Sequence, residues 1–182
     1  MPPKVKITRD MIIDAAFDII RNEGSENLNA RNIAARLNCS TQPVLYSFKT
    51  VDEIREAVYR KADEYHTSFI LPKETDREPM LAMGLNYVRF GHEERNLFRF
   101  LFQSDKFTGM DIKTLLNNPA LSEIINVMAQ GLKVNKKEAK EFFLSFWCLT
   151  HGLASLLANN SMAYDEKTVR KILEKAYEKE MN

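Results

Sequence analysis

The sequence predicts an all-α protein of about nine helices. Apolar residues recur every three or four positions along almost the whole 182-residue chain, which is the spacing of one helix face. Runs with the strict alternation of a half-buried strand are absent, and no segment repeats at a fixed period. At this length the chain can form one substantial core, or two small domains that share a helix.

The charge of the whole chain does not indicate a partner, because 26 basic residues stand against 25 acidic ones. No uninterrupted apolar run reaches the about 20 residues that span a bilayer. The segment MPPKVKITRD has no apolar run after its charges, unlike a secretory signal. We therefore expect a cytoplasmic protein with no membrane partner. Cys39 and Cys148 are expected to be reduced thiols that behave as small buried hydrophobic residues.

The first two helices have clear boundary signals. Thr8 is a good N-cap, Asp10 follows it in the first turn, and the apolar stripe stops at Gly24. Asn29 can cap a short second helix with the sequence ARNIAARL. That helix is expected to end at Asn38, because asparagine tolerates the left-handed conformation of a tight turn.

A proline sits among apolar residues in the next segment, CSTQPVLYSF. Ser40 is expected to be the N-cap of a third helix, which places Pro43 in the first turn. Proline is tolerated there because the backbone N–H of that turn has no helical partner to lose. Val44, Leu45 and Phe48 are then expected to form the inner side of this helix.

The fourth helix is predicted to link the N-terminal helices to the rest of the chain. TVDE forms a capping box with Thr50 as the cap and Glu53 reaching back, and the helix runs over residues 50–71. Charged residues and prolines over 72–79 indicate a surface connection. Further helices are expected over residues 80–91, 96–102, from Pro119 to about 132, 136–158 and 165–180.

The short helices carry a local charge asymmetry. Arg31, Arg36 and Lys49 lie between positions 27 and 49, where no acidic residue occurs. A surface that faces DNA phosphates needs such a local positive potential. Two short helices joined by a three-residue turn behind a supporting helix match the helix-turn-helix pattern, in which the last helix enters the DNA major groove.

Residues 8–54, TRDMIIDAAFDIIRNEGSENLNARNIAARLNCSTQPVLYSFKTVDEI, resemble the DNA-binding domain of the tetracycline-repressor (TetR) family of bacterial transcription regulators. In the second half, Trp147, His151 and Gly152 resemble a W-x-x-x-H-G signature found in part of that family. The resemblance implies a helix-turn-helix domain over residues 1–49. It also implies a helical ligand-binding and dimerisation domain over residues 50–182, with residues 50–71 as the linking helix.

Two positions depart from the family pattern. Asn38 stands where the family has glycine, and a gap-free alignment on Phe48 places Leu45 opposite the tyrosine of the family's Leu-Tyr-x-His-Phe run and Ser47 opposite the histidine. A shift by one residue would make Tyr46 the family tyrosine, and both alignments stay open. If Val44 and Phe48 face inward, Tyr46 lies about 200° from Val44 around the helix and faces outward.

Candidate DNA contacts follow from the motif and the resemblance. Base edges would be read by the first turn of the third helix, since glutamine can pair with adenine and proline can pack on a thymine methyl group. These reading residues are Thr41, Gln42 and Pro43. Phosphate contacts are expected from Thr8, Asn29, Arg31, Tyr46 and Lys49. Ser47 is added as a DNA contact from its place opposite the family histidine.

The second half supplies two further candidate sets. Its aromatic and methionine side chains either line an apolar effector pocket or form an ordinary core. The pocket set comprises Met83, Tyr87, Phe90, Phe98, Phe102, Phe107, Phe143, Phe146 and Trp147. A homodimer interface from the last two helices is implied by the resemblance, with burial inside the monomer as the alternative. The interface set comprises Leu149, Leu153, Leu156, Val169, Ile172, Leu173 and Ala176.

No catalytic or metal-binding pattern is visible. The histidines at 66, 92 and 151 have no metal or catalytic spacing, so we expect no cofactor, no metal and no enzyme activity. The family resemblance implies a repressor that a small apolar or amphipathic ligand releases from operator DNA. Two alternatives remain. One is a DNA-binding regulator without a small-molecule inducer, controlled by a protein or acting as an activator, and the other is a helical enzyme or lipid carrier.

Overall fold

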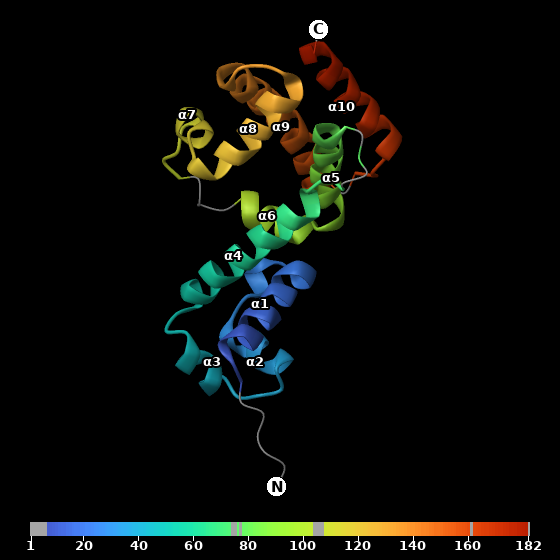
Figure 1. Cartoon of the computed structure of the whole chain (residues 1–182). Coiled ribbons are helices and arrows are strands. Elements are labelled where there is room, and N and C mark those ends of the chain that lie inside the picture. Colours follow the sequence, from blue (N-terminus) through green and yellow to red (C-terminus); the bar gives the residue numbers. More distant parts are fainter. Residues whose placement is uncertain (1–6, 74–75, 77, 104–107, 161, 182) are drawn as a thin grey trace. The chain divides into compact units, whose positions relative to one another are not determined.

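The computed structural model describes residues 7–73, 76, 78–103, 108–160 and 162–181, and this part of the chain contains helices and no β-strand (Figure 1). The all-α prediction is therefore confirmed, with ten α-helices in the described ranges where about nine were expected. Their bounds are α1 Arg9–Glu23, α2 Ala30–Arg36, α3 Gln42–Ser47, α4 Val51–Ile70, α5 Pro79–Glu93, α6 Arg95–Phe102, α7 Ile112–Leu116, α8 Ser122–Leu132, α9 Lys136–Asn160 and α10 Glu166–Met181. Short 3₁₀ turns cover Ser25–Asn27 and Pro119–Leu121.

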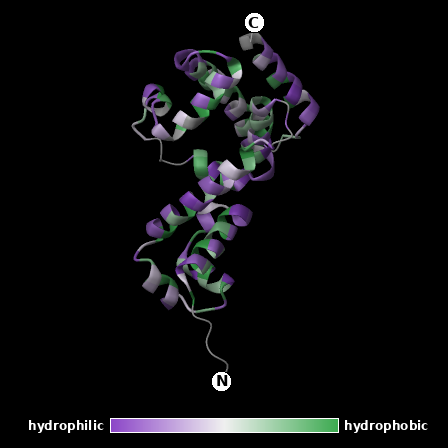
Figure 2. Ribbon diagram, in the orientation of Figure 1, coloured by the Kyte–Doolittle hydropathy of each residue, from purple (hydrophilic) through white to green (hydrophobic). Residues whose placement is uncertain are grey.

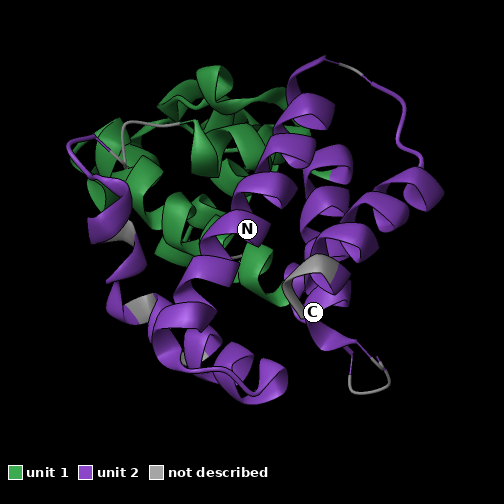
Figure 3. Cartoon of the chain, turned by 90° about the horizontal axis from the view of Figure 1, so that it is seen from above, with its two compact units in different colours: residues 1–68, 94–104 green, residues 69–93, 105–182 purple. Residues whose placement is uncertain are grey.

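The chain divides into two compact units, which Figure 3 shows in different colours. Unit 1 comprises residues 1–68 and 94–104, and unit 2 comprises residues 69–93 and 105–182. Helix α6 therefore belongs to the same unit as α1 to α3, although α5 precedes it in the chain. This division by packing differs from the functional division at residue 49, which stays a prediction.

Helix α1 is the centre of unit 1, and it contacts α2, α3 and α6. The Thr8 hydroxyl accepts a hydrogen bond from the Met11 N–H at 3.2 Å, and Gly24 ends the helix with φ at 94°. Ile12 and Ile20 are fully buried. Each of these boundary and stripe predictions is confirmed.

The turn between α2 and α3 differs from the prediction in one cap. The Asn29 side chain caps α2 by accepting from the Asn32 N–H at 2.9 Å, and Asn38 adopts the expected left-handed conformation with φ at 51°. Ser40, however, is not the cap of α3. Thr41 holds that position, and its backbone is already helical at φ −68° and ψ −17° with no capping bond from its side chain. Pro43 still lies in the first turn, as predicted.

Helix α4 begins with a capping box that is displaced by one residue. The Glu53 N–H donates to the Thr50 hydroxyl at 3.1 Å, as expected, but the Glu53 carboxylate accepts from the Lys49 N–H at 2.9 Å and not from the Thr50 N–H. The buried side of α4 continues from Ala62 to His66, whose ring packs edge-on against Phe102 with centroids 5.1 Å apart.

Burial of His66 should make the free energy of unfolding depend on pH. The side chain is 7% exposed, and desolvation lowers its pKa to about 4. The unfolded chain, with an ordinary pKa near 6.5, then binds more protons between pH 4 and 6.5, so stability rises with pH in that window. We expect a loss of about 2 kcal/mol between pH 7.5 and pH 5. Denaturation of His66→Phe at both pH values should show a smaller loss, and an unchanged loss would contradict this prediction.

Unit 2 is organised around α5 and α9, with α8 and α10 packed against them. The α5–α9 contact is close because glycines lie in it: a Cβ at Gly84 would meet the Phe146 ring at 2.7 Å, and one at Gly91 would meet the Ala154 carbonyl oxygen at 2.7 Å. Helix α10 is mostly hydrophilic (Figure 2) and contributes Val169 and Leu173 to the core of this unit.

Helix α9 has a length and composition that would suffice to cross a membrane, and it is the one such helix in the described part of the chain. A core helix of a soluble protein passes the same test, and α9 supplies Phe142, Phe146 and Ala154 to the core of unit 2. Both cysteines are free thiols, but the prediction that they are buried is wrong: Cys39 is half-buried and Cys148 is exposed.

Candidate nucleic-acid interface

Helix α3 presents an exposed outer face. The exposed residues of this face are Thr41, Gln42, Leu45 and Tyr46, and the exposed fraction of Tyr46 is 92%. The outward direction predicted for Tyr46 is therefore confirmed. The inward direction predicted for Leu45 is wrong, because this side chain is 56% exposed.

Leu45 lies at the edge of the buried side of α3. Residues 44 and 48 are one turn apart and define that side, with Val44 and Phe48 at 0% and 1% exposure. Leu45 is next to Thr41 around the helix, and the Thr41 carbonyl accepts the Leu45 N–H at 3.0 Å. Because Leu45 is about 100° from Val44 but only about 60° from Phe48, helix spacing does not decide its exposure, and the neighbouring helices do.

Arg9 of α1 holds the C-terminal end of α3. Its guanidinium carbon lies 3.9 Å from the centre of the Phe48 ring, and its Nη1 donates to the Ser47 carbonyl at 2.9 Å. A helix of six residues is too short to be stable alone, so its orientation depends on such contacts. This role of Arg9 could not be predicted from local sequence patterns, because it arises from contact between residues 38 positions apart.

An open groove of about 1070 Å³ lies beside α3 and the turn that precedes it. Its lining side chains carry no formal charge and combine apolar groups with hydroxyl and amide groups. They are Ile7, Met11, Leu37, Asn38, Cys39, Ser40, Gln42, Pro43, Tyr46 and Ser47. Leu45 is not among these lining residues.

The residues expected to contact phosphates lie around these helices, and they differ in exposure and in the hydrogen-bond donors that they have left for a phosphate. Thr8 accepts a capping bond, but its hydroxyl hydrogen can still be donated to a phosphate. Asn29 uses its oxygen for the cap and its amide N–H₂ for the Asn27 carbonyl at 3.2 Å. Arg31 and Lys49 are exposed, and Ser47 is half-buried.

The positive charge of this region is unevenly distributed. Arg36 forms an ion pair with the Glu23 carboxylate of α1, which offsets its charge. All three cations of the window without acidic residues are exposed, and Arg31 and Lys49 are the two whose charge no ion pair offsets among the described residues.

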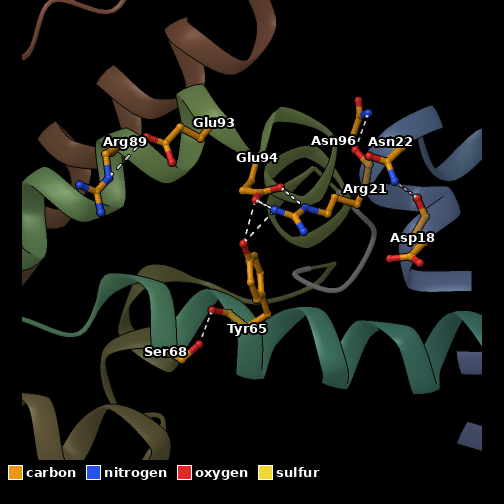
Figure 4. Close-up of polar contacts among 9 residues, drawn as sticks. All are labelled: Asp18, Arg21, Asn22, Tyr65, Ser68, Arg89, Glu93, Glu94 and Asn96. Atoms are coloured by element: carbon orange, nitrogen blue, oxygen red, sulfur yellow. Dashed lines mark hydrogen bonds and ion pairs between the residues drawn. The ribbon is translucent and has the colours of Figure 1, made fainter. Parts of the chain in front are cut away.

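A second polar cluster holds α6 to the helices of unit 1 (Figure 4). Glu94, which is 7% exposed, lies just before α6 and accepts from the Arg21 Nε at 2.8 Å and from the Tyr65 hydroxyl at 2.8 Å. A second Arg21 nitrogen also bonds to Glu94, and hydrogen bonding to this carboxylate is the main reason that the pKa of Arg21 is raised. The Asn96 amide donates to the Arg21 carbonyl at 3.0 Å. Sequence patterns did not predict this cluster, because Arg21 and Glu94 are 73 positions apart in the chain.

The predicted effector-pocket residues fall in both units. Phe98 and Phe102 belong to unit 1, where Phe98 is fully buried. Phe107 lies outside the described residues. The others belong to unit 2: Met83, Phe143 and Trp147 are half-buried, whereas Tyr87, Phe90 and Phe146 are buried. Their role in binding a ligand stays a prediction.

Polar groups from two helices meet within the aromatic core of unit 2. The Tyr87 hydroxyl and the His151 Nδ1 are 2.9 Å apart, and the Trp147 and His151 rings lie 5.2 Å apart. Burial raises the pKa of Tyr87 and lowers the pKa of His151. His151 is thus a hydrogen-bonded histidine of this core.

The predicted interface residues differ in how far they are exposed. Val169 and Leu173 are buried inside unit 2, whereas Leu149, Leu153 and Ala176 are half-buried. Leu156 and Ile172 remain 49% and 38% exposed. Burial within the unit therefore accounts for Val169 and Leu173, and the exposed apolar surface of this set is at Leu156 and Ile172. Among the described residues, no cluster of His, Cys, Asp and Glu side chains could hold a metal ion.

Comparisons with known proteins yield matches in structure. No protein-family model matches the sequence, and no curated protein matches it. A TetR-family transcriptional regulator from Streptomyces coelicolor superposes with a TM-score of 0.66 at 14% identity, over 95% of this chain and 84% of that one. A TetR-like regulator from Rhodococcus sp. RHA1 has a TM-score of 0.63 at 16% identity, over 97% and 95%.

A third match is the multidrug binding protein EbrR complexed with imidazole, with a TM-score of 0.56 at 19% identity over 92% of this chain and 88% of that one. At identities this low, the structural matches establish the fold alone. The chain therefore has the fold of the TetR-family transcriptional regulators.

Proposed function

We propose that this protein is a cytoplasmic, homodimeric, sequence-specific DNA-binding regulator of the TetR family that represses transcription until a small apolar or amphipathic ligand releases it from its operator. Residues 1–49 would bind DNA, and residues 50–182 would bind the ligand and the second subunit. The observation that carries the proposal is the exposed face of α3, with Gln42 and Tyr46 held outward by a buried Val44 and Phe48.

The DNA-binding part rests on chemistry as well as on fold. Gln42 offers an amide that can pair with adenine, and Tyr46 offers a hydroxyl to a phosphate. Arg31 and Lys49 add exposed positive charge next to the same helix. A dimer follows because two half-sites about one turn of DNA apart are read by two copies of such a helix.

The release mechanism would be a two-state equilibrium. A ligand that binds better to the state with unsuitably spaced DNA-binding helices shifts the population toward that state. Operator binding must then weaken ligand binding by the same factor. Support for a ligand is the aromatic interior of unit 2 with its Tyr87–His151 hydrogen bond, and the imidazole complex of the similar EbrR structure.

Two other functions remain as alternatives. A regulator controlled by a protein partner, or an activator, would bind the operator but would not respond in a screen of small molecules. A helical enzyme or lipid carrier would show no preference for any DNA sequence at low salt. Selection of bound fragments from genomic DNA would test these possibilities first, because it supplies the operator for every later experiment.

Gln42→Ala and Lys49→Ala should weaken operator binding in different ways. Loss of the amide should cost about 1–3 kcal/mol at one base position and relax the preference there. Loss of the ammonium group should weaken binding to all sequences similarly and reduce the salt dependence, since it removes a phosphate contact. Affinity titrations against single-base operator variants, between about 50 and 200 mM salt, measure both effects. Equal and sequence-independent losses would contradict the reading role of Gln42.

Leu156→Glu should favour the monomer. The side chain is an exposed apolar group on α9, and a charge placed in a dimer interface would be desolvated in both subunits. The dimer dissociation constant should rise about tenfold or more, as measured by analytical ultracentrifugation. Val127→Glu is the matched control, because Val127 is 55% exposed on α8 and lies outside the predicted interface. Equal dimer dissociation constants for the two variants would show that Leu156 does not lie in the dimer interface.

A further inference from the structure

Leu45 is an exposed apolar side chain on the outer face of α3. It is 56% exposed, and it lies one turn after Thr41, the first of the expected reading residues. Leu45 was expected on the buried side of this helix, so the proposed function includes no role for it. A single exposed leucine is ordinary on a protein surface, but this one belongs to the helix proposed to face DNA bases.

The direction of this side chain is set by the buried contacts of α3. Val44 and Phe48 are buried, and Arg9 stacks on the Phe48 ring while donating to the Ser47 carbonyl. Rotation of α3 to bury Leu45 would draw Val44 out of its buried position. The backbone that carries the leucine is therefore ordered before DNA arrives, and only the leucine rotamer has to be fixed on binding.

The chemistry of Leu45 differs from that of its neighbours. Gln42 and Tyr46 can form hydrogen bonds, whereas a leucine side chain that covers a base donor or acceptor would leave that group unsatisfied. Base edges in the major groove present one apolar group, the 5-methyl group of thymine. A leucine on the reading face consequently favours a base that carries this methyl group and disfavours the others.

We propose that Leu45 is a specificity-determining residue that reads the 5-methyl group of a pyrimidine in the operator. This inference rests on the proposed function, and it adds a contact outside the Thr41–Pro43 turn. Leu45 is not among the residues that line the groove with Gln42, Pro43 and Tyr46. The methyl contact of Leu45 is separate from the hydrogen bonds proposed for Gln42.

The test uses operator DNA in which each thymine is replaced in turn by deoxyuridine, which removes the methyl group and keeps every hydrogen-bonding group. For the wild-type protein, the substitution should weaken binding about fourfold at one position of a half-site. Replacement in both half-sites should weaken it about 15-fold. Leu45→Ala should bind the unmodified operator more weakly and lose the response at that position alone. A cytosine placed there should bind better when it carries a 5-methyl group.

The control variant is Gln42→Ala, which should keep the full deoxyuridine response at the position of Leu45. Because Leu45 is exposed, its replacement should leave the melting temperature and the helical circular dichroism unchanged. A Leu45→Ala variant that responds to deoxyuridine as the wild type does, or that binds the operator equally well, overturns the inference. So does a change in its oligomeric state, which would assign Leu45 to a protein contact. If the wild-type protein has no preferred DNA sequence, the proposed function itself fails.

Discussion

Arg21→Ala is expected to lower the free energy of unfolding of unit 1 by about 2–4 kcal/mol. The substitution leaves the carboxylate of Glu94, which is 7% exposed, without its cation. Loss of one partner of a fully buried pair typically costs about 3–5 kcal/mol. The expected value is lower because the Arg21 side chain is 41% exposed, so water screens part of the interaction. Hydrogen exchange in α1, α4 and α6 measures the loss.

The double variant Arg21→Met with Glu94→Leu separates the ion pair from the packing around it. Replacement of a buried pair by apolar groups of similar volume is often neutral or stabilising, so the double variant should recover most of the lost stability. Tyr65→Phe removes the hydroxyl that donates to Glu94 at 2.8 Å and should cost about 1–2 kcal/mol. If the double variant is no more stable than Arg21→Ala, the loss comes from the packing of Arg21 on Tyr65 and not from the unpaired carboxylate.

Gly91→Val should destabilise unit 2 by about 3 kcal/mol. A Cβ at this position would lie 2.7 Å from the Ala154 carbonyl oxygen and 2.8 Å from the Ala154 Cα, and backbone atoms cannot move aside as a flexible side chain can. Helices α5 and α9 would have to separate, with loss of the contacts in the core between them. Urea denaturation followed by the fluorescence of Trp147, the one tryptophan of the sequence, reports on this unit.

Gly131→Val is the matched control for the change at Gly91. Gly131 lies in α8, and a Cβ there would meet no atom within 4 Å. Its replacement should therefore change stability by no more than about 0.5 kcal/mol, since valine costs slightly less than glycine in a helix. Equal losses at both positions would mean that the substitution acts through the unfolded chain or through helix propensity and not through the α5–α9 contact.

Much of the fold could be predicted because local signals decided it. Thr8, Asn29 and Thr50 act as caps within three residues of the groups they bind, and Gly24 and Asn38 have the φ angles that glycine and asparagine tolerate. The outward direction of Tyr46 followed from helix periodicity alone. The start of α3 was misplaced by one residue, because Ser40 and Thr41 are both acceptable caps and the choice depends on the path of the turn.

The amino-acid sequence by itself determined the helical class, most of the helix boundaries and the outer position of Thr41, Gln42 and Tyr46, since these depend on interactions a few residues apart. Only the tertiary structure decided which distant groups meet. Arg9 supports α3 from α1, Glu94 accepts from Arg21 and Tyr65, and Gly91 lies against Ala154. The same holds for burial: Leu173 is covered within unit 2 while Leu45 is exposed, because neighbouring helices and not hydropathy determine which leucine has contact with water.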